Sequence, residues 1–227
     1  MKHKEIYASV RRLIDERELD DENLDVASDD LSELIEEDPE CGWAYGLLSE
    51  IYYWTGETAD PEDKMFYFGE GVKWGEEGVE AEPESLEANF WLSVNWGSFG
   101  QEKGIMKSLA LISPIREKAE LAIGIDESYF YGGPWRVLGR LFHKAPGFPI
   151  SIGDKYKAEE CLEKAIGFGP NFYLNHLFMA ELQISRREKE RARQELEWIL
   201  NAPLNRNHEI EDQVYKDQAE ALLTREF

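Results

Sequence analysis

Two arginines four positions apart are the residues of this chain best suited to binding chemistry. Arg136 and Arg140 are separated by about one helical turn, so in a helix their side chains point to the same side. A guanidinium presents its N–H donors in a planar fork that matches a carboxylate or a phosphate. His143 and Lys144 follow closely, and the four side chains together predict one basic patch.

Aromatic and apolar side chains share the helical phase of these arginines. They are Trp43, Tyr53, Trp54, Phe90, Val94, Leu177 and Ile184. Together with the basic patch they predict a groove for a ligand or peptide with an apolar body and an anionic end. A second interpretation stays open, in which Glu181 and Glu50 neutralise the arginines and the aromatic residues fill the core.

Motifs of catalysis are absent from the sequence, which has no GxSxG, no GxxxxGK[ST] and no HExxH. The four histidines are scattered along the chain: His3, His143, His176 and His208. Gly71, Gly75 and Gly78 follow no predicted strand, so they favour close helix packing over a phosphate loop. We therefore expect no catalytic residues and no cofactor.

Metal and thiol chemistry are also weakly supported. The acidic run Asp15–Asp38 is typical of a solvated face, and within it Asp20-Asp21-Glu22 lacks the alternating ligands and glycine of a calcium loop. We therefore expect no metal site. Cys41 and Cys161 lie 120 positions apart without a CxxC partner, which predicts free thiols, with Cys161 buried.

Composition limits the classes of partner. A net charge of −22 argues against nucleic-acid binding, because a phosphate backbone would be repelled. No stretch is long and apolar enough to cross a bilayer, and no apolar signal region follows the polar start at Met1–Glu5. We expect a cytoplasmic protein as the chain is written, and a periplasmic one if a leader and a lipoprotein cysteine have been removed.

A repeating pattern provides the elements that position these residues. Trp135, Leu138, Gly139 and Phe142 share one face of a first helix, and Ala158, Leu162 and Ala165 share one face of a second, which Pro170 ends. The order resembles the tetratricopeptide repeat (TPR), with a longer gap between the two helices that we assign to a loop around Pro146–Pro149.

The same phase predicts an all-α fold, a TPR-like α-α superhelix of about five hairpins. The predicted hairpins span residues 4–38, 41–82, 84–126, 130–169 and 171–201, and a capping helix spans 208–225. An insertion is expected around Gly104 within the third hairpin. A helical solenoid of 227 residues need not divide, so we expect a single domain.

Three segments resemble the T-component of TRAP transporter systems. They are the runs Trp91–Gly97, Ala119–Asp126 and Gly133–Arg140, and the resemblance extends from about Leu31 to the last helix. Eukaryotic regulators of microtubule dynamics share a similar helical core and are a more distant match. The family motif carries over to Trp91, Trp96, Trp135, Arg136, Gly139 and Arg140.

The resemblance implies a periplasmic, membrane-tethered helical-repeat protein. It implies a homotrimer that partners a substrate-binding protein in the uptake of organic acids or other small apolar anions. Exposed aromatic residues in the insertions, Phe66, Tyr67, Phe68 and Phe148, are candidates for contact with a neighbouring subunit or for folding back onto their own hairpins. Family members also carry an anchoring cysteine after a lipoprotein signal, whereas Cys41 lies inside a predicted helix.

Two function classes follow from these observations. The first is a transporter accessory protein that binds a small hydrophobic organic acid; the second is an adaptor that binds an acidic peptide tail on its concave face. The predicted ligand-binding residues are Arg136, Arg140, Trp43, Trp54, Phe90, Trp91, Trp96, Trp135, His143 and Lys144. An enzyme is not expected, because no nucleophile, base and orienting group can be assembled from these motifs.

Overall fold

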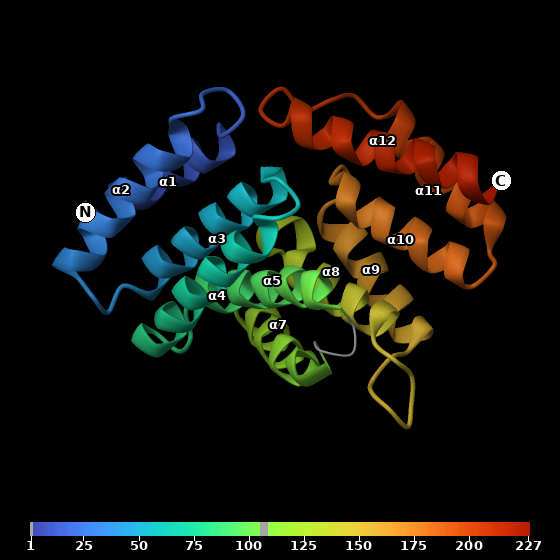
Figure 1. Cartoon of the computed structure of the whole chain (residues 1–227), viewed down its shortest axis with the longest axis horizontal. Coiled ribbons are helices and arrows are strands. Elements are labelled where there is room, and N and C mark those ends of the chain that lie inside the picture. Colours follow the sequence, from blue (N-terminus) through green and yellow to red (C-terminus); the bar gives the residue numbers. More distant parts are fainter. Residues whose placement is uncertain (1, 105–108) are drawn as a thin grey trace. The chain divides into compact units, whose positions relative to one another are not determined.

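The computed structural model describes residues 2–104 and 109–227 and is helical throughout (Figure 1). Eleven α-helices and one short 3-10 helix lie in this part of the chain. The β-type pairing within it is one isolated bridge between Gly147 and Gly153. The TPR-like all-α class predicted from the sequence is therefore confirmed. The chain forms two compact units, residues 1–126 and 127–227, and the expectation of a single domain stays a prediction.

Unit 1 consists of three consecutive hairpins. Its elements are α1 (Lys2–Asp15), α2 (Asn23–Glu37), α3 (Gly42–Thr58), α4 (Lys64–Ala81), α5 (Leu86–Lys103), the 3-10 helix η1 (Leu109–Leu111) and α7 (Ile112–Asp126). Helix α3 packs against both α4 and α5, and α4 also packs against α5. This is the packing expected of stacked hairpins, in which each first helix contacts its own partner and the next first helix.

Small residues allow α4 to approach its neighbours. A methyl group on Gly75 would lie 2.8 Å from Leu92 Cβ, and one on Gly78 would lie 2.8 Å from Tyr45 Cβ. A methyl group on Gly71 would lie 2.6 Å from the side chain of Asn95. The helix-packing interpretation of these glycines is confirmed, because contacts this short leave no room for a side chain.

Helix α1 is attached more lightly than the helices that follow it. Its buried residues are Val10 and Ile14, whereas most of α3 is buried. Polar contacts also hold α1 against the rest of unit 1: Arg11 pairs with Glu50 on α3, and Tyr7 Oη donates to Glu87 Oε1 over 2.8 Å.

Unit 2 consists of two hairpins and a final helix. Its elements are α8 (Tyr129–Lys144), α9 (Lys155–Phe168), α10 (Tyr173–Ser185), α11 (Lys189–Asn201) and α12 (Glu209–Glu226). Helix α12 packs against α10 and α11, which agrees with the predicted capping role. A cluster that includes Leu177, Leu196 and Tyr215 forms the core between these three helices.

The start of α8 departs from a regular helix. Phe130, Tyr131 and Gly132 have φ values of 47°, 60° and 72°, so the regular turns begin after Gly132, with Pro134 in their first turn. A methyl group on Gly132 would lie 2.8 Å from Ala165 Cα on α9. The sequence predicted the helix here but not the left-handed turn that precedes it.

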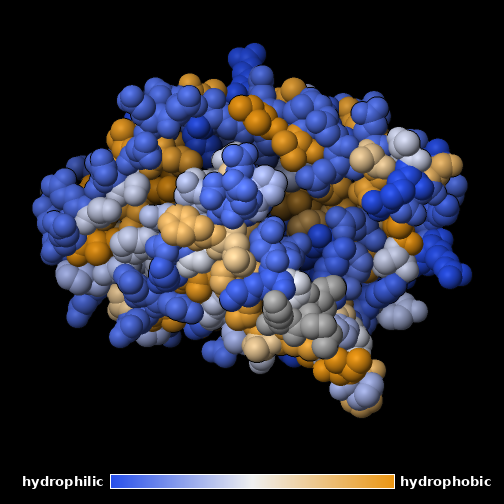
Figure 2. Space-filling model, in the orientation of Figure 1, coloured by the Kyte–Doolittle hydropathy of each residue, from blue (hydrophilic) through white to orange (hydrophobic). Residues whose placement is uncertain are grey.

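A loop joins α8 to α9 where the sequence predicted an insertion. Asp154 caps α9 by accepting from the backbone N–H of Tyr156 over 2.9 Å and of Lys157 over 3.2 Å. The side chain of Phe148 is 94% exposed and Ile150 is also exposed. The loop projects from its unit in Figure 1, and the same projection carries apolar residues in Figure 2.

The insertion expected around Gly104 lies partly outside the described residues. Gly104 itself follows α5 with φ 85°, a conformation that favours glycine, and residues 105–108 are not described. Phe66, Tyr67 and Phe68, which the sequence assigned to another insertion, lie instead in the first turns of α4, where Phe68 is buried and Phe66 is exposed. None of the helices in the described ranges is long and apolar enough to span a membrane.

We predict that Gly139→Ala destabilises the fold by about 1–3 kcal/mol. A Cβ at this position would lie 2.7 Å from Leu162 Cγ and 3.2 Å from the carbonyl oxygen of Ala158, so α8 and α9 would have to separate. Urea unfolding followed by circular dichroism measures the change.

Gly97→Ala is the matched control, because Gly97 is also inside a helix but has open space around its Cα. That change is expected to stabilise the chain by about 0.5–1 kcal/mol through helix propensity alone. Equal effects of the two substitutions would contradict the packing role of Gly139.

Candidate functional site

In unit 2, helices α8 and α10 place two cationic side chains against one carboxylate. Arg140 Nη1 donates to Glu181 Oε2 over 2.6 Å, and Lys144 Nζ donates to the same oxygen over 2.7 Å. Arg140 and Lys144 are one turn apart on α8, which lets both reach Glu181 on α10. We refer to Arg140, Lys144 and Glu181 as the Arg140 cluster.

An aromatic ring also packs on the guanidinium of this cluster. The Cζ atom of Arg140 lies 4.1 Å from the ring centroid of Phe178, which is one turn before Glu181 on α10. A cation over a ring face is attracted by the quadrupole of the ring. Arg140 Nε is buried and has no hydrogen-bond partner among the described residues. The guanidinium is therefore oriented but not fully satisfied.

The charges of the cluster favour an ionised carboxylate. Burial by itself would raise the pKa of Glu181, but Arg140 and Lys144 outweigh it and hold that pKa below its usual value. Two cations then face one anion, so the cluster keeps positive charge. This is an arrangement that can accept a second anion from solution.

His143 is a neutral neighbour of the cluster. Burial, followed by repulsion from Lys144 and Arg140, lowers the pKa of His143 to about 4. Its Nδ1 atom is buried without a hydrogen-bond partner in the described chain. At neutral pH the ring therefore adds no charge to the predicted basic patch, and its role in ligand binding stays a prediction.

Arg136 lies beneath the surface and holds its own unit together. Only 5% of it is exposed, and its Nη1 donates to Asn175 Oδ1 over 3.0 Å and to the carbonyl oxygen of Phe130 over 3.4 Å. Its guanidinium also lies 4.6 Å from the ring centroid of Phe172. Arg136 thus supports the left-handed turn at the start of α8, and its predicted role in ligand binding stays a prediction.

The predicted aromatic residues of unit 1 pack on one another between α3 and α5. Ring centroids are 4.8 Å apart for Tyr53 and Trp54, 5.5 Å for Tyr53 and Trp91, and 4.9 Å for Phe90 and Trp91. Phe90 is 0% and Trp91 1% exposed. These side chains fill the core of unit 1, as the second interpretation of the sequence expected.

The remaining predicted tryptophans lie nearer the surface. Trp43 packs edge-on against Tyr7, with ring centroids 5.1 Å apart, and Trp96 is partly buried on α5. Trp135 Nε1 donates to Glu127 over 3.2 Å, and Lys164 Nζ lies 3.7 Å from its ring centroid. A single groove that joins the aromatic residues of unit 1 to the arginines of unit 2 stays a prediction.

The two acids proposed as neutralising partners behave differently. Glu181 pairs with Arg140, as the alternative interpretation predicted. Glu50 departs from that interpretation. It pairs with Arg11 on α1 and accepts a hydrogen bond from Trp54 Nε1 over 3.2 Å. The role of Arg11 was not predicted. The four-residue spacing of Tyr7 and Arg11, which puts both on one side of α1, was the available signal.

Both cysteines are free and Cys161 is buried, as predicted, and Cys41 is buried as well. Burial raises the pKa of the Cys41 thiol to about 11, so this thiol is protonated at neutral pH when nothing is bound to it. Cys41 caps the start of α3 rather than lying inside the helix.

Comparison with known proteins places this geometry in a family. The family model for the TRAP transporter T-component matches residues 77–226, which include α8, α10 and the whole Arg140 cluster. The chain belongs to the TRAP transporter T-component family. The model for regulator of microtubule dynamics protein 1-3 also matches more than half of the chain, residues 6–144, so the chain belongs to that helical family as well. No curated protein sequence matches the chain.

Solved structures agree on the fold of this T-component family member. A thermophilic TPR protein from Thermus thermophilus is 15% identical with a TM-score of 0.66, covering 96% of this chain and 100% of that one. PilF of Pseudomonas aeruginosa is 15% identical with a TM-score of 0.56, over 97% and 92% of the two chains. Yeast Tom70 is 15% identical with a TM-score of 0.51, over 89% of this chain and 38% of Tom70. At this identity the likeness concerns the fold alone.

We predict that His143→Gln reduces the loss of stability on acidification. The unfolded chain binds a proton near the ordinary pKa of 6.5, whereas the folded chain binds it only near 4. Stability that is complete above the unfolded value is therefore lost as the pH falls between the two values, by about 2 kcal/mol at about pH 5.

Urea unfolding at about pH 7 and about pH 5 measures the loss of stability on acidification for the wild type and for His143→Gln. The difference between the two losses is the contribution of the His143 ring. The charged groups that face it are Lys144, Arg140, Glu181 and Lys155, and all four are common to both proteins. Equal losses in the two proteins would show that another group is responsible.

Proposed function

We propose that the protein is a non-enzymatic binding component of a TRAP-type transport system, and that the Arg140 cluster receives the anionic group of its ligand. The observation that supports this most directly is the excess of cations over Glu181 at a partly exposed position. The side chains of Arg140 and Lys144 are 20% and 47% exposed. Solution anions can therefore reach both.

A ligand carboxylate would bind by sharing or displacing Glu181. The guanidinium fork of Arg140 can donate to two oxygens, while Lys144 acts as a point charge with three donors. Phe178, which already covers the guanidinium, offers an apolar surface beside the charge. A small organic acid with an apolar body fits this combination.

An acidic peptide tail is the second candidate. Phe90 and Trp91 are buried in unit 1, so they contribute little apolar wall to a pocket for a small molecule. A peptide needs only a local clamp for its carboxylates, because its backbone can extend over neighbouring helices. The half-exposed Lys144 suits such a ligand.

The partner and the compartment are proposed from the family. We propose a substrate-binding protein of the same transport system as partner, a periplasmic location and a homotrimer. Membership of the T-component family supports the first two. The exposed Phe148 and Ile150 on the loop after α8 support contact with another subunit, because an isolated apolar loop tip is stabilised when it is covered.

Substitutions in the cluster are expected to change affinity in opposite directions. Arg140→Ala combined with Lys144→Ala should weaken binding of decanoate about tenfold or more, because two charge-assisted hydrogen bonds are lost. Glu181→Gln should strengthen it several-fold, because the internal competitor is neutralised. Isothermal titration calorimetry measures both, with decanamide as the uncharged probe.

Arg116→Ala is the matched control, since Arg116 is an exposed arginine paired with Glu120 on α7. It should leave the affinity unchanged. A synthetic peptide with an acidic, free C-terminus, compared with its amidated form, tests the second candidate. Wild-type affinity of the cluster variants for every probe that binds, or no binding of either class of probe, would reject the Arg140 cluster as the binding site.

A further inference from the structure

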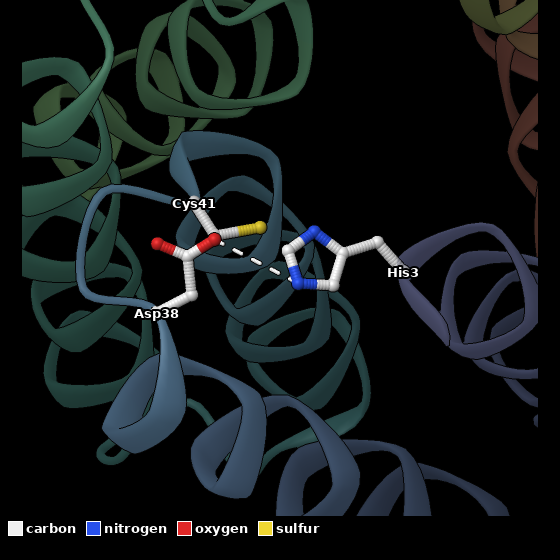
Figure 3. Close-up of side chains that lie close together, drawn as sticks. All are labelled: His3, Asp38 and Cys41. Carbon is white, nitrogen blue, oxygen red and sulfur yellow. Dashed lines mark ion pairs between the residues drawn. The ribbon is translucent and has the colours of Figure 1, made fainter. Parts of the chain in front are cut away.

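Three side chains of different chemistry meet where α1 passes the turn between α2 and α3 (Figure 3). His3 Nε2 lies 3.7 Å from Asp38 Oδ2. The ligand atoms of His3, Asp38 and Cys41 all lie within 4.8 Å of one another. No metal-ligand spacing marks this cluster in the sequence, because His3 is far along the chain from the other two.

The local backbone fixes two of the three groups. Asp38 is the C-cap residue of α2, and Cys41 is the N-cap residue of α3. The backbone N–H of Cys41 donates to the carbonyl oxygen of Asp38 over 3.1 Å, and Asp38 Oδ1 accepts from the N–H of Glu40 over 3.3 Å. Asp38 Oδ2 is thereby left facing His3, whose side chain is 47% exposed and can rotate.

We propose that His3, Asp38 and Cys41 bind one Zn²⁺ ion through Nε2, a carboxylate oxygen and Sγ. An imidazole, a carboxylate and a thiolate are the three protein ligand types of zinc. Tetrahedral zinc with bonds of about 2.0–2.3 Å holds its ligand atoms roughly 3.3–3.6 Å apart. The three atoms therefore need to close by about an ångström, and the exposed His3 side chain provides that movement. A water molecule completes the fourth position.

The chemical types of the three ligand atoms determine which metal ions the site prefers. Calcium and magnesium take oxygen ligands, so a site with a thiol and an imidazole disfavours them. The acidic run Asp15–Asp38 beside the cluster attracts cations in general and raises their local concentration. The thiolate and the imidazole then favour zinc over calcium and magnesium.

Binding changes the thiol without any redox step. The S–H bond of Cys41 breaks, its proton passes to the buffer, and a Zn–S bond forms. His3 coordinates as the neutral ring. Because the thiolate is the form that binds the metal and an ordinary thiol is protonated near neutral pH, one proton is released for each ion bound. The ion would join α1 to the turn between α2 and α3.

Zinc titration of the full chain tests the proposal. The purification tag is removed and the thiols are kept reduced with a phosphine. Calorimetry in two buffers of different ionisation enthalpy should give one Zn²⁺ per chain, a dissociation constant of about 1 µM or lower, and release of one proton. Co²⁺ in place of Zn²⁺ should give a thiolate-to-metal charge-transfer band in the near ultraviolet.

Two variants test the ligands Cys41 and His3, and a third is a control. Cys41→Ser should abolish the cobalt band and weaken zinc binding about 100-fold or more, since even an outer-shell partner contributes about 10- to 100-fold. His3→Gln should weaken binding at least about tenfold. Cys161→Ser, which changes the other buried thiol, should bind as the wild type does.

Because His3 is exposed, its substitution is expected to leave the fold intact. His3→Gln removes an exposed side chain, so loss of zinc binding in a variant with an unchanged circular dichroism spectrum identifies a ligand. Absence of zinc binding by the wild type would overturn the proposal. Wild-type affinity in both His3→Gln and Cys41→Ser would overturn it too, because the metal would then bind elsewhere.

Discussion

The other features of the structure depend on one constraint, the close approach of packed helices at glycine residues. A methyl group on Gly46 would lie 2.4 Å from the backbone nitrogen of Ala88 in α5, and one on Gly139 would lie 2.7 Å from Leu162 in α9. At such distances the helices can be paired in only one rotational phase. That phase decides that Leu138 and Phe142 face the core while Arg140 and Lys144 face outward from it. The chemistry of α8 is thus set by a neighbouring glycine.

Both units use a buried asparagine to fix one hairpin against the one before it. Asn95 on α5 donates to the carbonyl oxygen of Ser49 on α3 over 2.8 Å. Asn175 on α10 donates to the carbonyl oxygen of Tyr131 at the start of α8 over 3.1 Å. A shift of one turn would leave these buried groups without partners, which costs more than the bonds contribute. Hydrogen bonding therefore specifies register where apolar packing alone would tolerate slippage.

The left-handed turn at the start of α8 is likewise held in place by hydrogen bonds from buried polar side chains. Phe130 and Tyr131 have positive φ, a region that is unfavourable for aromatic residues. Arg136 and Asn175 bond to their carbonyl oxygens, and Tyr131 stacks on Phe172 with centroids 4.9 Å apart. The buried arginine offsets local backbone strain, which explains why its charge points into the protein.

The hairpins were predictable because their signal is local. Trp135 and Gly139 are one helical turn apart, as are Ala158 and Leu162, and these two sets were enough to predict α8, the loop and α9. The pairing of Arg140 with Glu181 was one of two interpretations, since helical phase puts both on the same side but gives no distance. Burial of Arg136 was not predictable, because it depends on the turn at Phe130. That turn involves two aromatic residues and no local sequence signature.

Long-range polar contacts were the part that sequence could not supply. Arg11 and Glu50, or His3 and Cys41, are separated by more than a hairpin, and no periodicity links them. Trp54 lies on α3, and Phe90 and Trp91 lie on α5, the first helices of their hairpins. Whether they line a groove or fill a core depends on how tightly α3 and α5 pack, and in unit 1 they fill the core.

The light attachment of α1 makes the N-terminal hairpin the region of unit 1 that opens at least cost. Local opening of α1 requires withdrawal of Val10 and Ile14 and loss of polar and aromatic contacts near its surface, whereas release of α3 would expose most of its length. A helix held by few buried apolar side chains opens at a lower free-energy cost than a helix that is buried along most of its length. Such a graded opening gives a repeat protein a hinge-like end that can adapt to whatever lies against it.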